Sequence, residues 1–170
     1  MILDGYWKKE LLSQAKMLYV LQRQLLPQSL QEHIANKAVL LSAVAARKAF
    51  EDERWAEQKA KGNSTIHYES ELLKQTISAM MWDCIDTSDY PPGHVIVELY
   101  GSSRTTSVEP TTIINSIIHA YYWDWTYDER NRMKGFLVSS DHNKQKCLFA
   151  VSIDEWISFI KSVNRLSHIY

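Results

Sequence analysis

The chain of 170 residues suits one domain that buries roughly two thirds of the surface its unfolded form would expose. A hydrophobic fraction of 45% and a charged fraction of 23% are typical of globular proteins and exclude an intrinsically disordered chain. The 19 Lys and Arg residues are balanced by 20 Asp and Glu residues, so the net charge of -1 excludes a strongly basic protein that holds a polyanion by its overall field.

Two cysteines, Cys84 and Cys147, have no neighbouring partner motif. The sequence also shows no secretory signal and no apolar stretch long enough to span a bilayer. We therefore expect a soluble, cytoplasmic protein with reduced thiols and no membrane contact.

The first half of the chain predicts two helices. Residues 4–26 carry apolar side chains at helical spacing, with Asp4 as a candidate N-cap and Pro27 closing the segment. A second helix is predicted from Ser29 to Lys61, ending before Gly62. At about 1.5 Å per residue it would measure roughly 45 to 50 Å, so we expect a kink or a projecting end.

The middle of the chain predicts two more helices separated by irregular segments. Residues 68–86 suggest a third helix, and "DTSDYPPGH" then breaks the regularity. The segment 94–100, "HVIVELY", fits either a short strand or a helical turn, and 101–110 reads as a polar loop. Pro110 suits the first position of a fourth helix, which would contain the apolar run "IINSIIHAYYW" at 113–123.

The last third predicts a hairpin and a terminal helix. Two apolar runs, 135–139 and 146–151, flank a polar turn around Asp141, His142 and Asn143. Ser152 and Glu155 have capping-box spacing at the start of the final helix. Its apolar stripe comprises Ile153, Trp156, Ile157, Ile160 and Val163.

These elements predict a mainly helical (α+β) fold. We expect a bundle of four or five helices with a small C-terminal antiparallel β-hairpin. The chain would form a single domain over residues 1–170, with a helical part at about 4–122 and the hairpin plus terminal helix at about 135–166.

Asn115 and His119 interrupt the apolar run of the fourth predicted helix. They stand four positions apart, so their side chains would share one helical face. One interpretation is a binding or catalytic pair that acts on one ligand. The other is structural, because a single His on an apolar helix is more often a core residue bonded to a carbonyl oxygen.

The segment "INSIIHAY" resembles the signature helix of the HEPN superfamily, R-N-x-x-x-H, in which an aromatic residue often follows the His as Tyr121 does here. The resemblance implies an antiparallel helical bundle and a homodimer. In active HEPN ribonucleases the His would assist proton transfer at the RNA 2′-hydroxyl and the Arg would stabilise the phosphorane charge, without a metal. Here Ile114 occupies the position of the Arg, so the electrostatic half of that mechanism is missing.

The resemblance therefore implies a bacterial accessory protein that is non-catalytic or weakly catalytic. It would bind protein or RNA, in phage defence or in a toxin–antitoxin pair, as a homodimer or with a partner protein. Two alternatives stay open: a metal-independent endoribonuclease that uses His119 and Asn115, and a structural subunit of a larger complex. Arg47 on the long second helix is a candidate replacement for the missing cation.

Other candidate binding residues lie in two later segments. His142 lies in the predicted hairpin turn, and Arg130 and Arg132 lie upstream of it. Such side chains either contact phosphate groups or are simply the polar, solvated residues of a turn. The aromatic run at 120–129 suits base stacking or a protein partner, but its acidic residues favour packing in the core or at a dimer interface. No metal-ligand spacing and no glycine-rich phosphate loop occurs, so we expect no metal and no nucleotide cofactor.

Overall fold

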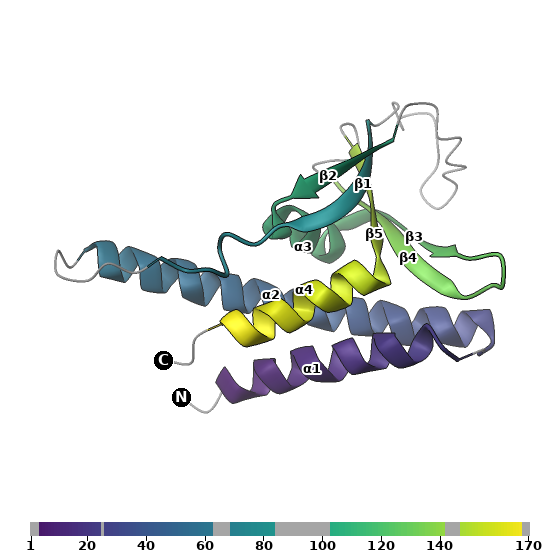
Figure 1. Ribbon diagram of the computed structural model, residues 1–170, viewed down its shortest axis with the longest axis horizontal. Coiled ribbons are helices and arrows are strands. Elements are labelled where there is room, and N and C mark those ends of the chain that lie inside the picture. Colours follow the sequence, from purple (N-terminus) through teal and green to yellow (C-terminus); the bar gives the residue numbers. More distant parts are fainter. Residues whose placement is uncertain (1–3, 25, 63–68, 84–102, 142–146, 168–170) are drawn as a thin grey trace.

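The computed structural model describes residues 4–24, 26–62, 69–83, 103–141 and 147–167. These residues form four helices and five strands (Figure 1). In chain order they are α1 (Asp4–Leu21), α2 (Gln28–Lys61), β1 (Ile77–Asp83), β2 (Arg104–Val108), α3 (Pro110–Ile118), β3 (Ala120–Tyr127), β4 (Met133–Ser140), β5 (Cys147–Ser152) and α4 (Ile153–Leu166).

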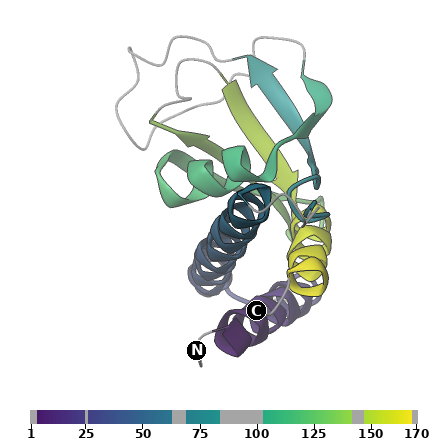
Figure 2. The ribbon, with the colours of Figure 1, turned by 90° about the vertical axis from the view of Figure 1, so that its left-hand side faces the viewer.

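The strands form one antiparallel sheet with the order β2-β1-β5-β4-β3. Because β2 and β3 lie at opposite edges, the connection between them must cross the sheet, and α3 makes that crossing. Figure 2 shows α3 lying across the face of the sheet that the other helices also occupy. α3 and α4 contact the strands, whereas α1 packs on α2 and α4 and lies farthest from the sheet (Figure 1).

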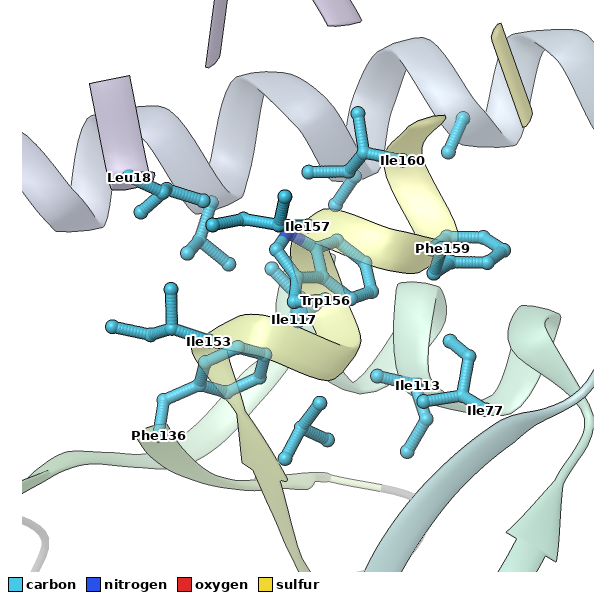
Figure 3. Packing of buried hydrophobic residues seen from close by; sticks show 14 of the residues in the cluster. Leu18, Ile77, Ile113, Ile117, Phe136, Ile153, Trp156, Ile157, Phe159 and Ile160 are labelled. Carbon is cyan, nitrogen blue, oxygen red and sulfur yellow. The ribbon is translucent and has the colours of Figure 1, made fainter. Parts of the chain in front are cut away.

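α4 joins the sheet to the other helices. Its predicted apolar stripe is buried as a whole, and the Oγ of Ser152 accepts a hydrogen bond from the N–H of Glu155 at 3.1 Å, as the capping-box spacing predicted. Trp156 lies between Phe136 of β4 and the helices (Figure 3). Its indole Nε1 donates to the Oγ of Ser42 at 3.0 Å, so α4 is tied to the middle of α2. The prediction of this helix is confirmed.

α2 is the longest element, and its small residues allow close helix packing. Its 34 residues correspond to about 50 Å at the usual helical rise. Small side chains from Ala35 to Ala46 are buried against α1, α3 and α4, and Gln31 donates to the carbonyl oxygen of Leu21 at the end of α1. The C-terminal part of α2 extends past α1 and α4, as expected (Figure 1). Trp55 on this part is 62% exposed.

The expected helical bundle with a small C-terminal hairpin is wrong. The fold is α+β with a five-stranded antiparallel sheet, in which the two predicted hairpin strands, β4 and β5, are neighbours. Residues 77–83 form strand β1 where we expected a helix, and 104–108 form β2 where we expected a loop. The segment 94–100 lies outside the described residues.

The helix predicted through residue 123 also ends too late. α3 stops at Ile118, and the aromatic residues from Ala120 onward form β3. A short apolar run does not by itself distinguish a helix from a strand. In the structure the pairing of β3 with β4 decides between them.

Candidate functional site

Asn115 and His119 lie at the C-terminal end of α3. Pro110 occupies the first turn of this helix, as predicted, and Ile113, Ile114 and Ile117 are buried beneath it. His119 is the C-cap residue, and its N–H donates to the carbonyl oxygen of Asn115 at 2.9 Å. Both side chains are exposed, and within the described residues neither makes a hydrogen bond or an ion pair. The pair is therefore open to solvent.

Among the described residues, neither the motif position nor Arg47 supplies a cation to this pair. Ile114, which stands at the position of the HEPN arginine, is only 1% exposed and belongs to the core. Arg47 is exposed on α2, where its Nε pairs with the Oε1 of Glu51 at 2.8 Å. Among the residues that the structure describes, no hydrogen bond or ion pair joins Arg47 to Asn115 or His119. The structure thus does not bring the candidate replacement cation to the pair.

The aromatic run after His119 attaches β3 to α2. The indole Nε1 groups of Trp123 and Trp125 both donate to the Oδ1 of Asn36, at 2.9 and 2.8 Å. Trp123 also stacks on Phe136, with ring centroids 4.9 Å apart. The main use of this run is therefore packing, as the acidic neighbours predicted.

Two tyrosines of β3 are held by carboxylates. The hydroxyl of Tyr127 donates to the Oε1 of Glu32 at 2.6 Å, and burial followed by this hydrogen bond raises the pKa of Tyr127. The hydroxyl of Tyr122 donates to the Oδ2 of Asp124 at 3.3 Å. Burial, and then the negative charge of Asp124, raise the pKa of Tyr122 to about 12. Both hydroxyls therefore stay protonated near neutral pH. Tyr121, a candidate binding residue at the start of β3, is half-buried.

A surface hollow lies where α2, α3 and β3 meet. It has a volume of about 200 Å³ and is lined by Asn36, Leu40, Ile117, Ala120 and Trp123. Leu40 is 46% exposed, and Val44, one turn further along α2, is 38% exposed. The hollow and these two side chains form an apolar surface, which we call the α2–α3 surface. Neither Asn115 nor His119 lines the hollow, although each lies within two residues of one that does.

The remaining candidate residues lie elsewhere. The β3–β4 turn is closed by Asp128, whose Oδ1 accepts the N–H groups of Arg130 and Arg132 at 2.9 and 2.8 Å. The guanidinium of Arg132 pairs with the Oδ2 of Asp128 at 2.7 Å. These bonds, with the backbone N–H of Arg132 contributing most, lower the pKa of Asp128. Arg132 thus stabilises the turn, and neither arginine lines the hollow. His142 lies outside the described residues.

The sequence did not single out Asn36, Leu40 or Asp124. A signal for Leu40 and Val44 existed, because apolar residues at these positions fall off the buried stripe of α2. The partners of Asn36 are 87 and 89 positions away, and no local pattern marks such a contact.

Within the described ranges, no group of three or more His, Cys, Asp and Glu residues is placed to hold a metal ion. In the same part of the chain, no helix has the length and apolarity needed to cross a membrane. The described residues thus place a solvent-exposed amide and imidazole close in sequence to the lining of an apolar hollow. Comparison with protein-family models, with curated proteins and with solved structures gives no match.

Proposed function

We propose that this chain is a non-catalytic accessory protein that acts by protein binding through the α2–α3 surface, with a second copy as its partner. The observation that carries the proposal is the hollow of about 200 Å³ lined largely by apolar side chains. Apolar side chains exposed next to one another are typical of binding surfaces in otherwise well-packed proteins.

A second copy fits because a hollow and projecting apolar side chains occur on the same surface. A contact with two-fold symmetry joins the same patch of both subunits, so each copy must offer both a projection and a recess. Leu40 lines the hollow and also projects from its edge, and Val44 projects one turn further along α2. In the proposed dimer each copy inserts these side chains toward the hollow of the other.

Binding is favoured over catalysis because, in the part of the chain that the structure describes, no ion pair or hydrogen bond ties a cation to the pair at the end of α3. Charge that develops on a phosphorane needs preorganised donors or cations. The buried Ile114 and the ion pair of Arg47 with Glu51 supply none. The proposed role in phage defence or in a toxin–antitoxin pair follows from the HEPN resemblance and stays a prediction.

Analytical ultracentrifugation tests the dimer. We expect the wild-type chain to sediment as a dimer and Leu40→Asp to weaken the association at least about tenfold, because a carboxylate would be buried against an apolar recess. Leu12→Asp is the matched control, since Leu12 is similarly exposed, at 48%, but lies on α1. A monomeric wild type, or equal loss in both variants, would overturn the proposal.

The alternative function, a metal-independent endoribonuclease, is favoured by one observation. The side chains of Asn115 and His119 are both exposed. Labelled RNA incubated with the protein and EDTA distinguishes the two functions. We expect no cleavage by the wild type or by His119→Ala. Chelator-resistant cleavage that disappears in His119→Ala would instead establish the enzyme.

A further inference from the structure

The outer side of β3 has no neighbouring strand among the residues that the structure describes. β3 spans eight residues, Ala120–Tyr127, and its strand partner within the described ranges is β4, on its inner side. Alternate residues of such an edge strand point their N–H and C=O groups away from the sheet. A long edge of this kind is a template for pairing with another chain unless something blocks it.

Asp124 blocks the centre of this edge. Its Oδ1 accepts the backbone N–H of Trp125 at 2.8 Å, and its Oδ2 accepts the hydroxyl of Tyr122 at 3.3 Å. The N–H of Trp125 is thus already bonded within its own strand, and the carboxylate is held beside it by Tyr122. An incoming strand would have to displace the carboxylate to use this N–H.

The charge of Asp124 adds to this effect when the incoming strand belongs to a second copy. An antiparallel pairing of β3 with β3 is symmetric, and Asp124 lies near the middle of the eight residues. The two carboxylates would meet in or near the centre of the new ladder. Like charges opposite each other destabilise a strand pair.

We propose that Asp124 keeps β3 from pairing with the β3 of a second copy. The residue acts as an autoinhibitory contact at the sheet edge. This inference does not rest on the proposed function, because it concerns the outer backbone edge of β3, although the side chains of Ala120 and Trp123 in this strand also line the hollow.

The experiment compares the self-association of wild type, Asp124→Ala, Asp124→Lys and Glu129→Ala by sedimentation equilibrium. Asp124→Ala removes both the hydrogen-bond acceptor and the charge. We expect a further doubling of mass relative to the wild type, with at least about tenfold tighter association. Asp124→Lys lacks the acceptor but places a cation at the edge, so it should keep the wild-type mass. Glu129→Ala removes an exposed acid from the adjoining turn and should also have no effect.

Hydrogen exchange at the Trp125 amide separates strand pairing from simple misfolding. In Asp124→Ala the protection of this amide should rise with protein concentration, whereas in the wild type it should stay constant. An unchanged mass in Asp124→Ala would overturn the proposal. Association of both Asp124→Ala and Asp124→Lys, or association without concentration-dependent protection of Trp125, would overturn it as well.

Discussion

Replacing Asn36 with alanine removes the single oxygen that accepts both indole N–H groups of β3. The donors are Trp123, which is partly exposed, and Trp125, which is 7% exposed. A typical intramolecular hydrogen bond contributes about 0.5 to 1.5 kcal/mol, and a buried donor left unpaired costs more than one that water can reach. The two bonds together correspond to about 1 to 3 kcal/mol.

The helix itself gains from this substitution, because Ala is a better helix former than Asn by about 0.5 kcal/mol. We therefore expect Asn36→Ala to lower the free energy of unfolding by about 0.5 to 2.5 kcal/mol. Urea denaturation followed by far-UV circular dichroism measures this change without relying on the fluorescence of six tryptophans.

A double-mutant cycle tests the cause of the loss. Trp125→Phe keeps much of the aromatic packing but removes the N–H donor. If the shared oxygen is responsible, the effects of Asn36→Ala and Trp125→Phe should be strongly non-additive. Purely additive effects, or a loss below about 0.3 kcal/mol for Asn36→Ala, would refute the reasoning. Asn36→Asp retains an acceptor and is the control.

Three further predictions concern packing and ionisation. Gly135→Ala should lower the free energy of unfolding by about 1 to 3 kcal/mol in urea titrations, because the added Cβ would lie 2.5 Å from the carbonyl oxygen of Val151. Ser42→Ala should cost about 1 to 3 kcal/mol in the same assay, because it leaves the buried Nε1 of Trp156 without an acceptor. The raised pKa of Tyr122, about 12 against 10.0 for an unperturbed tyrosine, favours the protonated hydroxyl in the folded state. The stability that the Tyr122 hydroxyl contributes should be fully present below pH 10 and should be lost as the pH rises toward 12. Thermal melting at each pH measures this loss, and in Tyr122→Phe the melting temperature should change less between pH 10 and 12.

The sequence predicts those elements whose signal is local and repeated. α4 is an example, because its capping residues and its apolar stripe agree over 14 residues. α2 is another, since 34 residues without an internal Pro or Gly leave little choice but a helix. The sequence also indicated β4 and β5, because two short apolar segments flank a polar turn.

Strands β1 and β2 were not predicted, because pairing with residues far away in the sequence determines their conformation. β1 has the sequence "ISAMMWD", whose Ala and Met residues suit a helix, and its strand conformation depends on partners in β2 and β5. The polar β2, "RTTSV", has only one buried residue at its end. In both cases the backbone is fixed by neighbours that lie far away in the sequence.

Part of the candidate site was named from the sequence, and its role stays a prediction. The sequence drew attention to Asn115 and His119. Both are exposed because they lie at the end of α3, and the periodicity of the sequence did not show where this helix ends. The hollow required the position of α2 relative to β3, and the bond from Asp124 to its own strand required the edge position of β3. Relative placement of elements is the information that a single sequence leaves open here.

The interior position of β1, between β2 and β5, has a consequence for how the chain folds. β3, β4, β5 and α4 follow one another closely, so this unit can form early from short-range contacts. β1 instead pairs with β5 through partners such as Met80 and Ala150, 70 positions apart, and must dock between β5 and β2. Closing so long a loop is entropically costly. We infer that the seam between β1 and β5 forms late on the folding pathway, and that it is where a nascent or partly denatured chain first exposes its interior.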